Sequence, residues 1–244
     1  MNKAVEYMNV AVDLARRVAK EQEKNILKAA QAAADTLAKG GTIFTFGTGH
    51  SHLLAEEIFY RAGGLAKVYP IQDGPLMLHV SASRSSQMER FSGYAELLLH
   101  DIPCLRRGDI IFIFANSGRN TVSVDMALCA KERGMLTVCV TSLNHSQNVT
   151  SRHPSGKRLF EVCDIVIDNG GVKGDACIEI GKNVCGPTST MIGAMLMQAI
   201  VCGAVDILTA KGIEPEVFKS GNLDGGDEAN QRYLEKYKGI IRSL

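Results

Sequence analysis

A run of five apolar residues, Ile110 to Phe114, constrains the fold of this chain most strongly. A strand without polar residues is typical of a parallel sheet that is covered by helices on both faces. Other strand-like runs and helical stretches alternate along the chain. The strand-like runs lie at 42–46, 65–69, 136–141 and 164–168, and the helical stretches lie at 52–62, at 122–133 and from Pro187 onward, where proline suits the first helical position. This alternation predicts a three-layer, doubly wound α/β fold.

A chain of 244 residues fits one large α/β domain. We expect a single domain over 1–244, with a helical segment at 1–39, an α/β core at 40–210 and a C-terminal extension at 211–244. Residues 4–39 contain no Gly or Pro and carry apolar residues at helical spacing. They predict one long N-terminal helix or two shorter ones, and so long a helix suggests contact with another subunit.

The charge balance excludes some classes of partner. Lys and Arg number 27 and Asp and Glu number 26, so no global field favours nucleic acid or an anionic membrane.

The N-terminal segment lacks an apolar signal core, and the scattered cysteines are typical of reduced thiols, which predicts a cytoplasmic protein. The segment Met191 to Leu208 is long enough to span a membrane, but Gln198, Asp206 and two glycines favour a buried helix. Residues 1–39 are too short for a helix-turn-helix module with a linker, so a regulator that binds DNA is disfavoured.

Two turns between a strand and a helix carry residues that bind anions. They are Gly47–His52 and Asn116–Thr121, and each follows an apolar strand with small polar residues. A helix N-terminus offers free N–H groups, and glycine lets an anion approach them closely. In a doubly wound sheet of order 2-1-3-4-5 the first and third strands are neighbours, so both turns would face one pocket. The alternative is that the glycines only make tight turns and the hydroxyls only cap helices.

A dinucleotide-binding fold is the weaker interpretation of the first turn. The pattern Gly-x-Gly-x-x-Gly starts at Gly47 and Gly49, but His52 occupies its third glycine position. No acidic residue ends the second predicted strand at Tyr69. We therefore expect no NAD and no other cofactor.

The two turns, together with the strand that ends at Thr141-Ser142, resemble the sugar isomerase (SIS) domain, in particular its phosphoheptose-isomerase-like branch. The resemblance covers residues 4–210. It implies a five-stranded parallel sheet, a homodimer or homotetramer, and a phosphorylated sugar as the ligand. The residues that it places at the ligand are Gly47, Thr48, Gly49, His50, Ser51, Asn116, Ser117, Gly118, Arg119, Asn120, Thr121, Ser189 and Thr190.

The sequence also departs from the pattern of the family in two respects. Ser117 matches a phosphate-binding serine of the family, whereas Asn120 stands where a second Ser or Thr is usual. Alignment through the first turn places the family's metal-binding histidine on Glu57 and its catalytic glutamate on Arg61. The resemblance therefore does not carry the heptose reaction or its metal to this chain, and we expect no metal site.

Isomerisation of an aldose to a ketose needs a base that moves a proton between neighbouring carbons. The candidates are Glu56, Glu57 and Glu179, with His52 as a further acid or base. The alternatives are a surface pair of Glu57 with Arg61, a surface acid at Glu179, and packing or capping roles for the histidines. His79, His145 and Asp175 are weaker candidates.

Arg152 to Arg158 form the one dense basic cluster, for which a solvated loop is favoured over an anion clamp. Two functions from different classes remain. The first is a phosphosugar isomerase that uses one of the glutamates. The second is a non-catalytic protein that senses a phosphorylated sugar and regulates a protein partner.

Overall fold

The computed structural model describes residues 2–244 of the chain. A five-stranded parallel sheet of order β2-β1-β3-β4-β5 forms its centre, which confirms the predicted fold class and strand order. The strands of this sheet are β1 (Ile43–Gly47), β2 (Val68–Ile71), β3 (Ile110–Phe114), β4 (Leu136–Thr141) and β5 (Ile165–Asp168). A separate antiparallel hairpin consists of β6 (Ala176–Ile180) and β7 (Asn183–Pro187).

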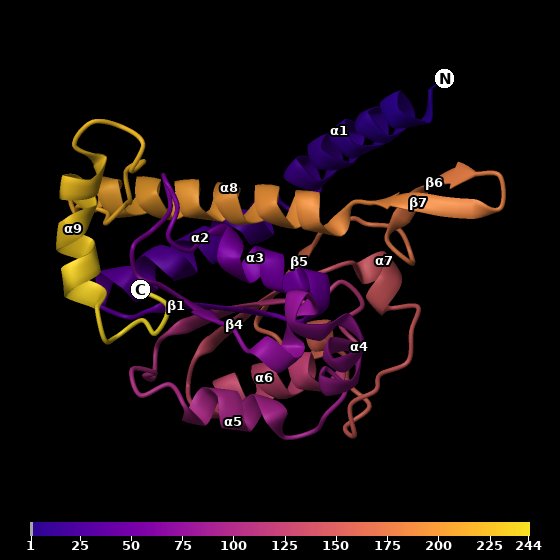
Figure 1. Cartoon of the computed structure of the whole chain (residues 1–244), viewed down its shortest axis with the longest axis horizontal. Coiled ribbons are helices and arrows are strands. Elements are labelled where there is room, and N and C mark those ends of the chain that lie inside the picture. The colour runs from indigo at the N-terminus through magenta and orange to yellow at the C-terminus, as the bar shows by residue number, and fades with distance from the viewer. Residues whose placement is uncertain (1) are drawn as a thin grey trace.

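Helices cover both faces of the sheet, with α2, α3 and α8 on one side and α5 and α6 on the other (Figure 1). The α-helices are α1 (Lys3–Glu21), α2 (Glu23–Ala38), α3 (His52–Glu57), α4 (Leu78–Met88), α5 (Tyr94–His100), α6 (Thr121–Glu132), α7 (Leu143–Ser146), α8 (Ser189–Ala210) and α9 (Gly226–Tyr237). Three 3-10 helices are Gly49–Ser51, Gly74–Leu76 and Leu159–Glu161.

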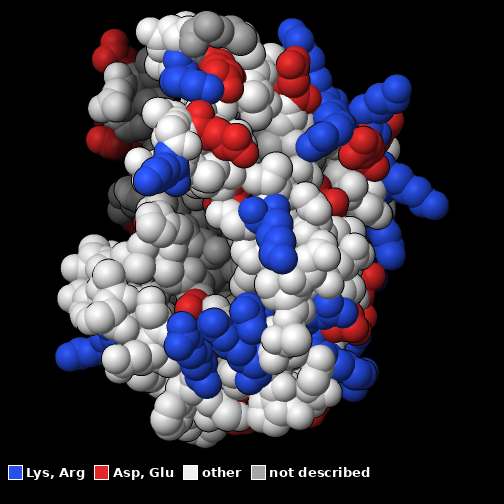
Figure 2. Space-filling model, turned by 90° about the vertical axis from the view of Figure 1, so that its right-hand side faces the viewer, with Lys and Arg blue, Asp and Glu red and all other residues white. Residues whose placement is uncertain are grey.

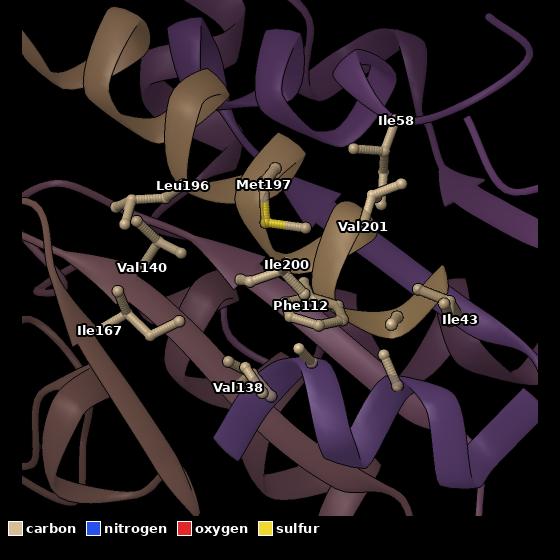
Figure 3. Close-up of a cluster of buried hydrophobic side chains, with 14 of the residues drawn as sticks. Ile43, Ile58, Phe112, Val138, Val140, Ile167, Leu196, Met197, Ile200 and Val201 are labelled. Carbon is tan, nitrogen blue, oxygen red and sulfur yellow. The ribbon is translucent and has the colours of Figure 1, made fainter. Parts of the chain in front are cut away.

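The apolar run Ile110–Phe114 packs against the helical layers on both faces of the sheet. Its even-numbered residues pack in the cluster under α2, α3 and α8, and Ile111 and Ile113 pack in the cluster under α5 and α6. Phe112 lies between Ile200 of α8 and Val138 of β4 in the first cluster (Figure 3). All five residues are at most 1% exposed, as expected for a central strand of a parallel sheet.

The N-terminal segment forms two helices that meet at Gln22. The side-chain carbonyl of Gln22 accepts hydrogen bonds from Asn25 Nδ2 (3.0 Å) and from the Asp168 amide (3.2 Å). A side chain thus holds this corner, without the Gly or Pro that would mark it in the sequence. α2 packs against α8, whereas α1 extends beside the β6–β7 hairpin beyond the sheet (Figure 1).

The long apolar helix α8 belongs to the hydrophobic core, in agreement with the predicted buried helix. Within residues 2–244 it is the one helix long and apolar enough to cross a membrane, and eight of its residues are buried against the layer of α2 and α3. Its start differs from the prediction. Pro187 ends β7, Thr188 is the N-cap, and Ser189 is the first helical residue.

Candidate functional site

The loops after β1 and β3 meet at the carboxyl edge of the sheet, where the N-terminus of α8 joins them. Together they surround a small cavity of about 20 Å³. The residues that line it are His50, Ser51, Leu54, Phe114, Ala115, Asn116, Val140, Asn169, Ser189 and Thr190. That volume holds about one water molecule, whereas small-molecule sites span roughly 300–1,000 Å³. A ligand larger than water would therefore have to extend outward from this cavity.

The face of the molecule at the right of Figure 1, where α7 and the hairpin lie, is hollowed. Figure 2 shows this face, with a group of Lys and Arg side chains beside the hollow. α7 directly follows β4, so this face contains the carboxyl ends of the strands. Ligands of doubly wound sheets bind at this edge.

Glycine at position 47 allows the first loop to fold back on itself. A Cβ atom there would lie 2.3 Å from the Ser51 carbonyl oxygen, so no larger residue fits without a shift of the backbone. The next residue, Thr48, is buried, and its hydroxyl donates to Glu89 Oε2 over 3.0 Å. Gly49 has a φ of +57° and begins the 3-10 turn that leads into α3.

The two histidines of the first loop differ in exposure. His50 is exposed and lines the cavity, whereas His52 is 6% exposed and its Nδ1 contacts the Gly49 carbonyl oxygen. The ring of His52 lies 5.6 Å from that of His79, between centroids. His79 thus packs against a residue of the first loop. The His52 side chain contacts other protein groups and does not line the cavity.

The second loop is held by side chains from the strands and loops around it. Asn116 Oδ1 accepts from Asn169 Nδ2 over 2.8 Å, and both residues line the cavity. Gly118 has a φ of +57°, and a Cβ atom there would lie 3.4 Å from both Leu159 Cβ and Thr141 Oγ1. Asn120 is the N-cap of α6, and its side chain makes no hydrogen bond to the helix backbone.

Two residues that sequence reasoning set aside or missed contact the second loop. Arg152 Nη1 donates to Asn120 Oδ1 over 2.8 Å, and the Arg152 carbonyl oxygen accepts from the Thr121 hydroxyl over 3.1 Å. The carbonyl oxygen of Glu89 accepts from the Val122 amide over 3.1 Å, so Glu89 connects the first loop to the first turn of α6, directly after the second loop. Both contacts join residues about thirty positions apart, and no local pattern reveals them.

The N-terminus of α8 is already occupied by a carboxylate. Asp175 Oδ1 accepts from the amides of Thr188 (3.0 Å) and Ser189 (2.9 Å), and Oδ2 accepts from the Ser189 hydroxyl. This negative charge faces the positive end of the helix dipole. The amides of Thr188 and Ser189 are therefore taken, while the N-terminus of α6 has no side-chain cap.

None of the four predicted catalytic side chains lines the cavity. Glu57 pairs with Arg61 Nη1 and accepts from Gln198 Nε2 over 3.1 Å, so it forms the surface pair that was the alternative. Glu56 accepts from Gln72 Nε2 over 2.5 Å. Glu179 is exposed on β6, in the hairpin that extends beyond the sheet.

The histidine after β4 lies near the hairpin. Burial lowers the pKa of His145, the charge of Asp175 opposes that shift, and Lys173 and Arg119 reinforce it. Its imidazole is therefore neutral at pH 7. Within the described residues no group of three or more His, Cys, Asp or Glu side chains is arranged to hold a metal ion.

Comparisons with known proteins agree with this architecture. The model of the SIS domain family matches residues 6–142, more than half of the chain. A UPF0309 protein of Geobacillus thermodenitrificans (strain NG80-2) is 47% identical over 230 residues, which cover 93% of this chain and 92% of that protein. The UPF0309 protein OB3413 of Oceanobacillus iheyensis is 43% identical, and the match covers 98% of each chain.

Solved structures share the fold at low sequence identity. A phosphoheptose isomerase from Francisella tularensis superposes with a TM-score of 0.54 at 16% identity, over 86% of this chain and 97% of that one. The phosphoheptose isomerase GmhA from Neisseria gonorrhoeae gives a TM-score of 0.52 at 14% identity, over 85% of this chain and 97% of that one. By its sequence match, and with a fold that these structures share, the chain belongs to the SIS domain family.

Proposed function

We propose that this chain binds a phosphorylated sugar at the carboxyl edge of the sheet and isomerises it between aldose and ketose. The phosphate lies at the second loop, where Ser117, Asn120 and Thr121 precede or begin α6. The sugar extends across the cavity toward His50, Ser51 and the start of α8.

One observation carries the proposal. The two loops chosen for anion-binding chemistry meet at one site, and of the two long helices that start there only α6 lacks a carboxylate cap. A phosphate at α6 gains the helix dipole and the first-turn N–H groups other than that of Val122, which bonds the Glu89 carbonyl oxygen. Membership of the SIS family supports a sugar phosphate as the ligand. So does a structural neighbour, Vibrio vulnificus NanR in complex with ManNAc-6P, with a TM-score of 0.50 at 16% identity over 98% of this chain and 70% of that one.

Glu56 is favoured over Glu57 as the base. It lies on α3, directly after the first loop, and its partner Gln72 is neutral. Glu57, in contrast, is held by the guanidinium of Arg61. A carboxylate in an ion pair is a weaker base, because the cation stabilises its charged form.

That ion pair favours a second candidate function, a non-catalytic sensor of the same ligand. Such a protein needs the binding site and no free base. Incubation with phosphosugars in D₂O separates the two functions. A catalyst exchanges the C–H hydrogen beside the sugar carbonyl for deuterium, which mass spectrometry detects, and Glu56→Gln should abolish this exchange. Glu132→Gln, on the exposed end of α6, is the matched control.

Binding itself is tested by calorimetry against sugar phosphates and the matching free sugars. We expect binding of a phosphosugar and none of its free sugar. Ser117→Ala should weaken that binding about tenfold or more, because a hydrogen bond to a charged group contributes about 1.5–3 kcal/mol. Ser243→Ala, next to the C-terminus and away from both loops, should change nothing (Figure 1). If no phosphosugar binds, or if the free sugar binds equally well, the proposal fails.

A further inference from the structure

A chain of hydrogen bonds fixes the side chain of Asn116 beside the small cavity. The Gly171 amide donates to Asn169 Oδ1 over 2.9 Å, and Asn169 Nδ2 donates to Asn116 Oδ1 over 2.8 Å. A backbone N–H group can only donate, so the Asn169 atom that faces Gly171 is the carbonyl oxygen. The orientation of the Asn169 amide in turn sets that of Asn116, whose oxygen faces Asn169 and whose nitrogen is left over.

The backbone of Asn116 is held as well. Its carbonyl oxygen accepts from the Ser142 amide and from the Thr141 hydroxyl, each over 3.1 Å. Asn169, which orients the side chain, is only 3% exposed. Backbone and side chain of Asn116 are thus both fixed before any ligand binds, so the amide needs no reorganisation to act on one.

The nitrogen of the Asn116 side chain is a free donor at the cavity. Asn116 lines the cavity and is half-buried, and its Nδ2 has no protein partner within residues 2–244. This atom is accessible, since it is not among the buried side-chain atoms that lack a partner. The hydroxyls of Ser51 and Thr190, which line the same cavity, have no partner in the described chain either. Three neutral donors therefore surround one small space.

The rest of the cavity wall is mainly apolar. Leu54, Phe114 and Val140 line it and are 6%, 1% and 2% exposed. No lysine, arginine, aspartate or glutamate is among the described residues that line it. Fixed donors in such surroundings stabilise a negative charge far more than they would in water. Because the cavity of about 20 Å³ holds about one water molecule, it admits a single oxygen atom of a ligand.

We propose that this cavity is an oxyanion hole that receives the carbonyl oxygen of the phosphorylated sugar, with the Asn116 amide as its principal donor. The inference rests on the proposed function and adds to it the group that stabilises the intermediate.

The isomerisation places a negative charge on that oxygen. When the base removes the proton from the carbon next to the carbonyl, the C–H electron pair forms a carbon–carbon double bond and the carbonyl π electrons move onto the oxygen. The N–H groups of Asn116 stabilise this charge. The proton of the neighbouring hydroxyl then moves to the charged oxygen, and the base returns its proton to the former carbonyl carbon, so no further reagent is consumed.

The variant Asn116→Asp tests the oxyanion hole, because it keeps an acceptor for Asn169 and replaces the free donor with a negative oxygen. Calorimetry compares 5-phospho-D-arabinonohydroxamate and 4-phospho-D-erythronohydroxamate with D-arabinitol 5-phosphate and D-erythritol 4-phosphate. A hydroxamate has the planar shape of the enediolate and can carry its charge, whereas the alditols have no carbonyl group. We expect the wild type to bind one hydroxamate at least about tenfold more tightly than the alditol phosphate of the same length.

Asn116→Asp should lose that preference, keep its affinity for the alditol phosphate within about threefold, and slow deuterium exchange about 10²–10³-fold. Asn169→Asp should act in the same direction. Its carboxylate accepts from the Gly171 amide but no longer donates to Asn116, so the Asn116 amide turns and presents its oxygen to the cavity. Asn222→Asp, exposed in the C-terminal extension, adds the same charge elsewhere and is the control. Melting temperatures verify that each variant folds.

The outcomes separate the oxyanion hole from the proposed function. A preference retained in Asn116→Asp, or equal losses for hydroxamate and alditol phosphate, would overturn the hole and leave the phosphate site standing. A wild type that prefers a hydroxamate but exchanges no deuterium would support the hole and overturn the isomerase activity. If none of the phosphorylated probes binds, the proposed function and the oxyanion hole both fail.

Discussion

Asp175 shows how a single residue shapes the candidate site. It is one of two non-glycine residues within 2–244 with a positive φ, at +71°, and its carboxylate caps α8 through Thr188 and Ser189. Loss of an N-cap side chain destabilises a protein by about 0.5–2 kcal/mol. A left-handed backbone conformation destabilises the folded state by roughly 1–2 kcal/mol for a residue other than glycine. The cap therefore offsets the local strain in the backbone.

Substitutions at this position separate the two effects. Asp175→Gly loses the cap but also removes the strain of the positive φ, so the free energy of unfolding should fall by less than about 1 kcal/mol. Asp175→Ala loses the cap and keeps the strain, so it should fall by about 1 kcal/mol or more. Urea denaturation measures both. An alanine variant as stable as the wild type, or a glycine variant less stable than alanine, would contradict this account.

Asp164 predicts a pH dependence of stability. Burial raises its pKa, but hydrogen bonds from Lys131 and from the amide and hydroxyl of Thr137 outweigh burial, so the pKa lies below the usual value. A lowered carboxylate pKa stabilises the fold fully above the unfolded pKa of about 3.9, and this contribution is lost as the pH falls through the folded pKa. Asp164→Asn should cost about 1 kcal/mol at pH 7.

The pH profile decides whether charge is the cause. The difference in urea midpoint between wild type and Asp164→Asn should shrink as the pH falls below about 4, where the wild-type carboxyl takes up a proton. A difference that stays constant from about pH 7 to about pH 3 would indicate a steric origin instead. Asp206→Asn, on the exposed side of α8, is the control.

At the scale of elements, α3 and α8 are coupled through a glycine. α3 follows the first loop and α8 begins with Ser189, so their spacing sets the distance between two walls of the site. A Cβ atom on Gly193 would lie 2.4 Å from Cδ1 of Leu54, which is buried. In a free helix Gly→Ala stabilises by about 1 kcal/mol, but overpacking of a core costs about 1–3 kcal/mol.

We therefore expect Gly193→Ala to destabilise the protein and to weaken phosphosugar binding. Leu54→Ala alone should cost about 2–5 kcal/mol through the cavity that it leaves. The double variant should be more stable than the sum of both losses by at least about 1 kcal/mol, since each change relieves the other. Additive losses in chemical denaturation would disprove direct contact between the two positions.

The elements themselves show what the sequence could predict. Apolar strands buried on both faces leave a strong pattern, so the sheet and both loops were predicted from residues such as Ile110–Phe114. Features made by long-range polar contacts were not. The corner at Gln22 depends on Asp168, the start of α8 depends on Asp175, and Arg152 reaches the second loop across a segment that looked solvated. By local rules Pro187 suits the first position of a helix, but in the structure it is the last residue of β7 in the hairpin.

On the scale of the whole molecule, one apolar surface lacks a partner within the described chain. Val5, Met8 and Val12 follow one face of α1 and are 52%, 60% and 44% exposed. The Tyr7 hydroxyl donates to the Pro187 carbonyl oxygen over 2.8 Å and fixes α1 to the hairpin. Contiguous apolar side chains on a held element are typical of a protein interface.

This surface supports the predicted homodimer or homotetramer. Light scattering after size exclusion should give two or four times the chain mass of 26.3 kDa. The double variant Met8→Glu with Val12→Glu should shift the mass toward 26.3 kDa, because burying two unpaired carboxylates in an apolar interface is strongly unfavourable. Lys20→Glu, an exposed charge near the end of α1, should leave the assembly intact. A wild-type mass of 26.3 kDa would contradict the prediction. A variant that stays oligomeric would place the interface elsewhere, and the exposed face of α1 would then need another partner.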